Sequence, residues 1–202
     1  MQTQQPQGGS NLEGEVAETF NQTPLHLAIQ YQQLSAVQAI LQYKTECCLN
    51  RQKGEEMGVI PNFNMADSSG ETPLSLAVKN SLMDIAEQLL AGGASVNSQL
   101  SGGITLLHRS ILDQDPQAAL FLLDHGADNT AFAPDTVFCR TSEKETPLEL
   151  AVKRHLPAVV EALCQRGADL STPDQSGNSP LWVALETGQE DVASILVQYH
   201  SG

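Results

Sequence analysis

The sequence predicts an all-α fold, a solenoid of about five helix-turn-helix units, and three observations lead to that prediction. A seven-residue segment at 146–152 has four echoes, which begin at residues 23, 72, 105 and 179. The steps between successive segments are 49, 33, 41 and 33 residues, and a period near 33 is typical of stacked helical pairs. Each segment opens with Thr or Ser, which cap helix N-termini, and in four of them proline follows, which suits the first helical position.

Composition narrows the class of protein. The 202 residues carry a formal net charge of −14, so binding to nucleic acid, which needs clustered lysine and arginine, is not expected. The four cysteines show no C-x-x-C spacing, which argues against a zinc site or a disulfide framework and favours a reducing, intracellular setting. No apolar run approaches the roughly 18 residues of a membrane span, and no signal peptide is recognisable. We therefore expect a soluble chain with no direct membrane insertion.

The first half of the chain contains a tail and an irregular step. Residues 1–18 are rich in Gln, Gly, Ser and Glu and are predicted to be a disordered tail. The array occupies 20–200, with repeats that start near 21, 70, 103, 144 and 177. A second helix of the first repeat is predicted from about Ser35 to Tyr43. The extra residues of the two long steps predict a surface loop near 44–66 and a second insertion near 130–143 on the same side, either plain connections or functional loops.

The later repeats carry clearer boundaries. Helices are predicted over 72–80 and 83–91 in the second repeat, and Pro116 and Pro157 begin the second helices of the third and fourth. Gly126 is a natural left-handed cap at the end of such a helix. The fifth repeat lacks this Gly-Ala-Asp close, and its last helix has the apolar face of an interior repeat. We therefore expect the array to continue beyond it.

The repeated segments resemble a known family. Thr-Pro-Leu-His-Leu-Ala at 23–28, its variants, and Gly-Ala-Asp at 126–128 and 167–169 resemble ankyrin repeats. Segments 60–63, 119–123 and 173–182 resemble more narrowly the endosomal proteins that combine ankyrin repeats with a FYVE domain. That resemblance implies a Rab effector-like trafficking protein, cytoplasmic and held on endosomal membranes by domains outside this chain. It also implies a protein partner, such as a small GTPase or a trafficking factor.

The resemblance also implies where a partner would bind, because first helices and hairpin tips line a concave face in ankyrin arrays. Lysine and arginine are scarce, so four basic residues near this face predict a basic spot for an acidic partner segment, the alternative being solvated charge. The predicted partner-contacting residues are Tyr31, Glu71, Lys79, Asn80, Ile104, Arg109, Leu112, Asp113, Lys144, Glu145, Lys153, Arg154, Asn178, Trp182 and Glu186.

Some side chains admit two interpretations. His26 and His108 are expected to hydrogen-bond neighbouring backbone and join repeats rather than to catalyse. Arg109 stands where the first, second and fourth repeats have leucine, so either its stem lies along the groove or it contacts a partner. Trp182 is either a partner anchor or core packing against the fourth repeat. Asn97 resembles the hydroxylated asparagine of this family, but a backbone-capping role is favoured.

No motif of an enzyme is recognisable. We find no nucleophile elbow, no phosphate-binding glycine loop and no paired carboxylates in a suitable context. We therefore expect no catalytic residues, no cofactor and no metal site. The sequence favours a non-catalytic protein-protein interaction scaffold, and the alternative is an architectural spacer that binds nothing at these repeats.

Overall fold

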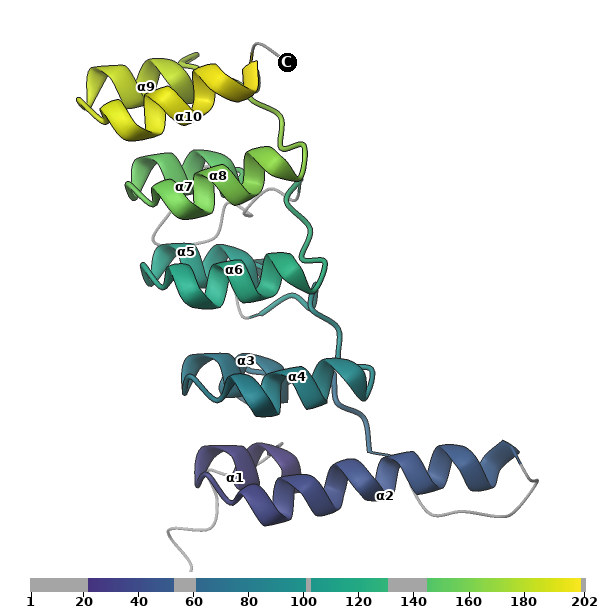
Figure 1. Cartoon of the computed structure of the whole chain (residues 1–202). Coiled ribbons are helices and arrows are strands. Elements are labelled where there is room, and N and C mark those ends of the chain that lie inside the picture. The colour runs from purple at the N-terminus through teal and green to yellow at the C-terminus, as the bar shows by residue number, and fades with distance from the viewer. Residues whose placement is uncertain (1–21, 53–60, 101–102, 131–144, 201–202) are drawn as a thin grey trace, which may run out of the picture.

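The fold is a single stack of helical pairs (Figure 1). The computed structural model describes residues 22–52, 61–100, 103–130 and 145–200, and within these ranges it contains ten helices and no strand. The all-α repeat solenoid is therefore confirmed. The five pairs, in order, are α1 (Pro24–Gln30) with α2 (Leu34–Gln52), α3 (Pro73–Lys79) with α4 (Met83–Ala91), α5 (Leu106–Leu112) with α6 (Pro116–Asp124), α7 (Pro147–Lys153) with α8 (Pro157–Gln165), and α9 (Pro180–Glu186) with α10 (Glu190–His200).

The first helix of every pair begins at a capped residue. The hydroxyls of Thr23, Thr72, Thr105, Thr146 and Ser179 each accept a hydrogen bond from the backbone N–H three residues on. These helices have only seven residues, too few to be stable alone, so packing between neighbouring pairs must stabilise them. The caps predicted from the repeated motif are thus confirmed.

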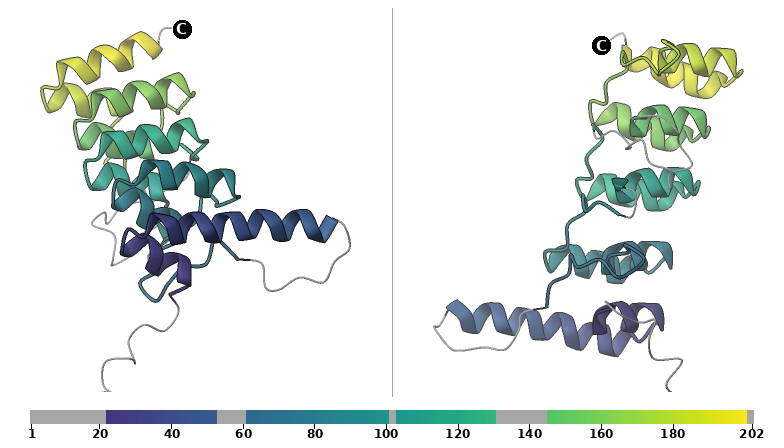
Figure 2. Two further views of the ribbon diagram at one scale, coloured as in Figure 1. Left: turned by 60° about the horizontal axis from the view of Figure 1, so that its bottom comes forward. Right: turned by 180° about the vertical axis from the view of Figure 1, so that it is seen from behind.

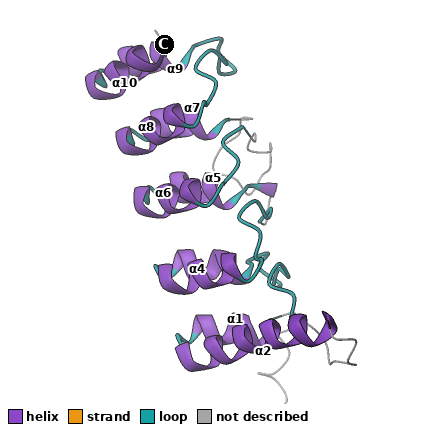
Figure 3. Cartoon of the chain, turned by 45° about the vertical axis from the view of Figure 1, so that its right-hand side comes forward, coloured by secondary structure: helices purple, strands orange, loops and turns teal. Residues whose placement is uncertain are grey.

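The second helices of the middle repeats end at glycine. Gly93, Gly126 and Gly167 have φ values of 90°, 82° and 75°, a left-handed conformation that a residue with a side chain adopts only at a cost. The predicted cap at Gly126 is confirmed. The chain then turns back toward the hairpin of the next repeat, and these turns lie along one edge of the stack (Figure 3).

Helix α2 differs from the other second helices, and the predicted loop is wrong over residues 44–52. Instead of ending near Tyr43, the helix runs to Gln52 and projects past the other pairs (Figure 2). Lys44 occupies the position that Gly93 takes in the second repeat, so no residue there favours a helix end. The Lys44 ammonium donates to the Gly92 carbonyl at 2.7 Å and lies 3.7 Å from the centre of the Phe63 ring. These contacts tie the extended helix to the second repeat.

Other predicted segments lie outside the described residues. They are the tail at 1–18, residues 53–60 of the first insertion, and almost all of the second insertion. Lys144, a predicted contact residue, lies outside them as well.

One apolar core runs through all five pairs. First helices of neighbouring repeats pack on one another, as α1 does on α3 and α7 on α9, and second helices do the same from α6 to α10. The exception is the junction between the second and third repeats, where α3 and α5 approach less closely than the other first helices do. That junction leaves space between side chains on the first-helix side of the stack.

Candidate functional site

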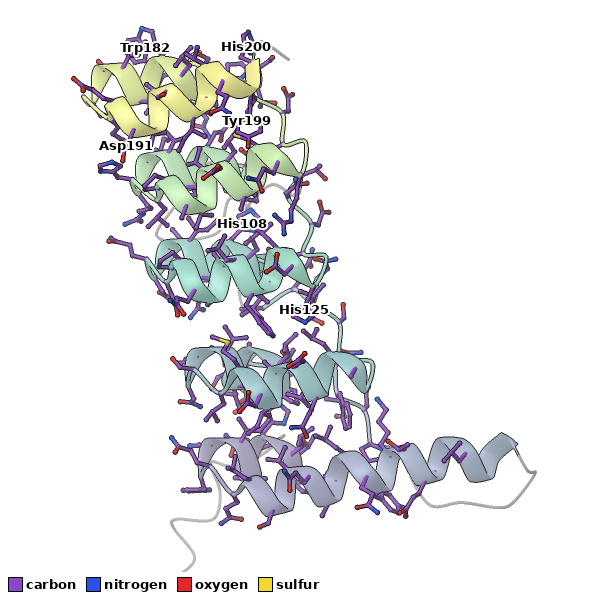
Figure 4. The ribbon with its side chains drawn as sticks, in the orientation of Figure 1. His108, His125, Trp182, Asp191, Tyr199 and His200 are labelled. Carbon is purple, nitrogen blue, oxygen red and sulfur yellow. The ribbon has the colours of Figure 1, made fainter. Side chains whose placement is uncertain are left out.

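The fourth residue of the first-helix motif joins two repeats in the case of His26. The His26 Nδ1 accepts from the Thr23 amide at 3.2 Å, which leaves the proton on Nε2, and Nε2 donates to the Glu71 carbonyl at 3.0 Å in the next repeat. The equivalent residues Ser75, His108 and Glu149 are also buried. The predicted structural role of this histidine position is confirmed, and Figure 4 shows His108 between the third and fourth pairs.

Trp182 takes this position in the fifth repeat, and it is 46% exposed. It lies on the outer side of the last pair, away from the fourth repeat (Figure 4). The alternative that it packs in the core against the fourth repeat is therefore wrong, and the hypothesis of a partner anchor stays a prediction.

Glu71 is the centre of a charged cluster between the second and third repeats. Its side chain is 13% exposed, and Oε1 lies 3.9 Å from both the Lys79 ammonium and the Arg109 guanidinium. The other carboxylate oxygen accepts from the Ser75 hydroxyl at 2.5 Å. Since Arg109 belongs to α5 and Lys79 to α3, the cluster links two repeats. The sequence left open whether Arg109 lies along the groove or contacts a partner. Its guanidinium lies near Glu71 at this junction, and the side chain as a whole is 35% exposed.

A cleft of about 180 Å³ opens at this cluster. Four residues predicted to contact a partner, Glu71, Lys79, Arg109 and Asp113, come together around it. The full lining is Glu71, Ser75, Val78, Lys79, Leu106, Arg109, Asp113 and Asp115.

The equivalent space between the fourth and fifth repeats is nearly closed. It measures only about 10 Å³, although it is built from corresponding positions of α7 and α9. The larger side chain of Glu149 stands there in place of Ser75, and Val183 stands in place of Arg109. The serine and the wider junction therefore explain the open cleft.

Two lysines of the predicted basic spot, Lys79 and Lys153, have acidic neighbours. The Lys153 ammonium donates to Glu145 Oε1 at 2.5 Å, as Lys79 pairs more loosely with Glu71. Arg154 ends α7 as its half-buried C-cap residue. Because Lys144 lies outside the described residues, the basic spot as a whole stays a prediction.

Two of the predicted contact residues are wrong for that role because they are buried. Ile104 is 3% exposed and belongs to the core, while Glu145 is 5% exposed and pairs with Lys153. Both immediately precede a capping threonine. The remaining predicted residues on this face are exposed or partly exposed, namely Tyr31, Asn80, Leu112, Asp113, Asn178 and Glu186.

Asn97 has the predicted backbone-capping geometry. Its side-chain oxygen accepts from the Asp128 amide at 2.8 Å, and its nitrogen donates to the Gly126 carbonyl at 3.4 Å. Asn64 makes the corresponding bonds to Ser95 and Gly93 one repeat earlier. The two asparagines thus connect successive hairpin edges.

Burial of a carboxyl group alters one ionisation on this side of the stack. Burial raises the pKa of Glu149. The Thr146 amide, which donates a hydrogen bond to the Glu149 carboxylate, lowers that pKa, but by less than burial raises it.

In the described ranges, no cluster of three or more His, Cys, Asp or Glu side chains is arranged to hold a metal ion. None of the helices described there is both long and apolar enough to cross a membrane.

Comparison with known proteins gives a consistent picture. Models of ankyrin repeats match residues 20–53, 53–133 and 133–202. The chain is 42% identical to mouse Rabankyrin-5 over 96 residues, which is 48% of this chain and 8% of that protein. It is 31% identical to the human B-cell lymphoma 3 protein over 171 residues, 84% of this chain and 34% of that protein. The chain thus spans well under half the length of these relatives.

Proposed function

Because the chain belongs to the ankyrin-repeat family, whose members serve as protein-protein interaction modules, we propose that its own partner binds across the first helices, centred on the cleft between α3 and α5. The observation that carries this proposal is the 180 Å³ cleft, at a position where the fourth and fifth repeats leave about 10 Å³. Clefts with a few convergent polar groups are where binding energy concentrates. The proposed role is that of a non-catalytic scaffold.

The chemistry of the cleft favours a partner that offers both hydrogen-bond donors and apolar groups. The exposed acid Asp113 stands at the rim, while the basic groups Lys79 and Arg109 already share Glu71. A partner with a basic side chain flanked by apolar ones matches this arrangement better than the acidic segment expected from the sequence. Charge matching of this kind mainly sets orientation and association rate.

The cellular setting is proposed from the relatives. The likeness to Rabankyrin-5 supports a role in endosomal trafficking, with a small GTPase or a trafficking factor as partner and with membrane attachment through domains outside this chain. The longer match to the B-cell lymphoma 3 protein extends over more of this chain at lower identity, so it supports only the general scaffold role.

A substitution copied from another repeat of the chain tests whether the cleft binds a partner. Ser75→Glu places in the second repeat the residue that the fourth repeat carries at Glu149, so it fills the cleft with a side chain this motif accommodates. Partners captured by the wild-type chain and identified by mass spectrometry should be lost with Ser75→Glu. Glu87→Ala, an exposed change on α4, should retain them.

The competing function is an architectural spacer, and the same experiment separates the two. A spacer would capture no protein specifically, either as the wild-type chain or as Ser75→Glu. For the trafficking role, binding to a panel of endosomal GTPases in their GTP- and GDP-bound forms is the measurement. Equal or no binding to both forms would contradict a role as an effector.

A further inference from the structure

The junction between the second and third repeats is the loosest in the described stack. At every other junction the helices of at least one layer pack closely, as α1 does on α3 and α6 on α8. Between the second and third repeats, neither α3 with α5 nor α4 with α6 approaches as closely. The described stack thus consists of two blocks, a first block of repeats one and two and a second block of repeats three to five, which follow one another in Figure 1.

The side chain that joins the first repeat to the second has a short counterpart at this junction. His26 Nε2 donates to the Glu71 carbonyl of the next repeat at 3.0 Å. Ser75 is the equivalent residue of the second repeat, and its hydroxyl lies 2.5 Å from the Glu71 carboxylate and 2.9 Å from the Thr72 carbonyl. Both groups belong to the second repeat itself. The hydrogen bonds of Ser75 therefore stay within its own repeat instead of reaching the third.

The ion pair that links the two blocks is long. The Arg109 guanidinium of α5 lies 3.9 Å from Glu71 Oε1, farther than a hydrogen bond reaches, and the arginine side chain is 35% exposed. A partly exposed ion pair of this kind contributes little to stability. At the next junction, by contrast, Arg166 Nε donates to a backbone carbonyl of the third repeat at 3.3 Å. The polar link between the blocks is therefore weaker than this link inside the second block.

Apolar side chains and open space make up much of the first-helix side of the junction. Val78 of α3 and Leu106 of α5 are each 5% exposed, and both line the cleft of about 180 Å³. Apolar contact has no preferred direction, so it resists a change of angle less than hydrogen bonds do. A close-packed interior also resists deformation. The cleft gives α3 and α5 room to move that the space of about 10 Å³ between α7 and α9 does not give.

We propose that the stack bends at the junction between the second and third repeats, as two blocks that each keep their internal packing. Ser75 permits the bend because it leaves this junction without the joint that His26 makes one repeat earlier. The cleft between α3 and α5 widens and narrows as the angle between the blocks changes. The bend itself needs no partner. Its consequence for binding rests on the function proposed above, because a partner seated in the cleft contacts both blocks and selects one angle.

Residual dipolar couplings of the full chain without a partner measure the bend. The backbone amides of a rigid stack all report one alignment tensor, whereas motion between two blocks averages the couplings of one block more than those of the other. Tensors fitted separately to the helices of the two blocks should differ in magnitude, with the smaller value in the first block. The third and fourth repeats, both in the second block, should give the same magnitude and are the control within the same data. One tensor that fits the described helices of both blocks would overturn the proposal.

Ser75→His tests the cause of the bend, because it places in the second repeat the residue that the first and third repeats carry as His26 and His108. This substitution should bring the two tensors to the same magnitude. Ser194→His, an exposed change on α10, should leave their difference as it is in the wild-type chain. A difference that persists in Ser75→His would contradict the role assigned to Ser75.

The bend and the binding function fail in different experiments. A chain with one tensor that loses its captured partners with Ser75→Glu would reject the bend and support the binding function. Two different tensors in a chain that captures no partner would reject the binding function and support the bend.

Discussion

At the scale of single residues, the joint between the first and second repeats depends on the buried side chain of His26. His26 accepts from its own cap and donates to the Glu71 carbonyl of the next repeat. We expect His26→Ala to lower the free energy of unfolding by about 1–3 kcal/mol, because it leaves buried backbone groups without partners. Urea unfolding measures the loss. Tyr31→Ala, 67% exposed next to the same helix, should cost less than about 0.5 kcal/mol, and an equal loss in both variants would count against the joint.

Glu149 makes stability depend on pH. Burial raises its pKa in the folded state, so its contribution is fully present below the unfolded value and is lost as pH rises through the folded value. Glu149→Gln keeps an oxygen for the Thr146 amide but cannot ionise. We expect the wild-type free energy of unfolding to fall relative to that of Glu149→Gln as pH rises above the ordinary glutamate range.

Asp191 offers a contrast of opposite sign. The hydrogen bond from His155, 3.0 Å away, lowers the pKa of this exposed carboxyl group. Its contribution is present above the unfolded value and is lost as pH falls through the folded one. Asp191→Asn should therefore reduce the fall in the free energy of unfolding at acidic pH. Glu149→Gln should instead reduce the fall that occurs as pH rises above the ordinary glutamate range. Parallel profiles for both variants and wild type would show that neither group contributes.

At the scale of helices, two glycines test two different physical constraints. Gly167 has a φ of 75° and open space around the position of a Cβ, so Gly167→Ala should cost about 1–2 kcal/mol from backbone conformation alone. Gly92 has an ordinary φ, but a Cβ there would lie 2.8 Å from the Phe63 ring. Gly92→Ala should therefore displace Phe63 from Lys44, seen as a change in the ring signals of Phe63 by NMR. Those signals should stay unchanged in Gly167→Ala.

The repeats and their caps were predictable because local chemistry specifies them. A threonine before a proline marks where a first helix begins. A glycine after an apolar run marks where a second helix ends. The extension of α2 was not predicted because it results from a missing helix-ending glycine. Lys44 stands where the next repeat has Gly93. The charged composition of 44–52 suggested a loop more strongly than the missing glycine suggested a helix.

The cleft could not be predicted from the sequence because two repeats determine it together. Its size depends on Ser75 rather than glutamate on α3 and on Arg109 rather than an aliphatic residue on α5. The pairing of Lys79 with Glu71 is likewise a matter of distance between side chains. The burial of Ile104 could have been predicted from its residue type, because an isoleucine in a hairpin is more often in the core than on the surface. Its position before the capping threonine instead suggested exposure.

At the scale of the whole molecule, stability should be uneven along the stack. Each pair in a repeat array contacts only its neighbours, so a terminal pair has half the interfaces of an interior pair. The large apolar side chains that are exposed belong to the first repeat and its insertion or to the last repeat, among them Leu34, Leu185 and Val197. In the 202-residue chain studied by itself, the fifth pair should therefore open at a lower free energy than the third and fourth pairs.

Trp182 makes that expectation measurable, because it is the only tryptophan and belongs to the last pair. If the last pair opens first, tryptophan fluorescence should change at a lower urea concentration than the helical circular dichroism of the whole chain. Coincident midpoints would mean that the stack unfolds as one cooperative unit. Leu196→Ala, which removes a buried contact of the last pair, should move the fluorescence midpoint down further than the dichroism midpoint. Leu122→Ala in the third pair should shift mainly the dichroism midpoint, which separates local opening from a general loss of stability.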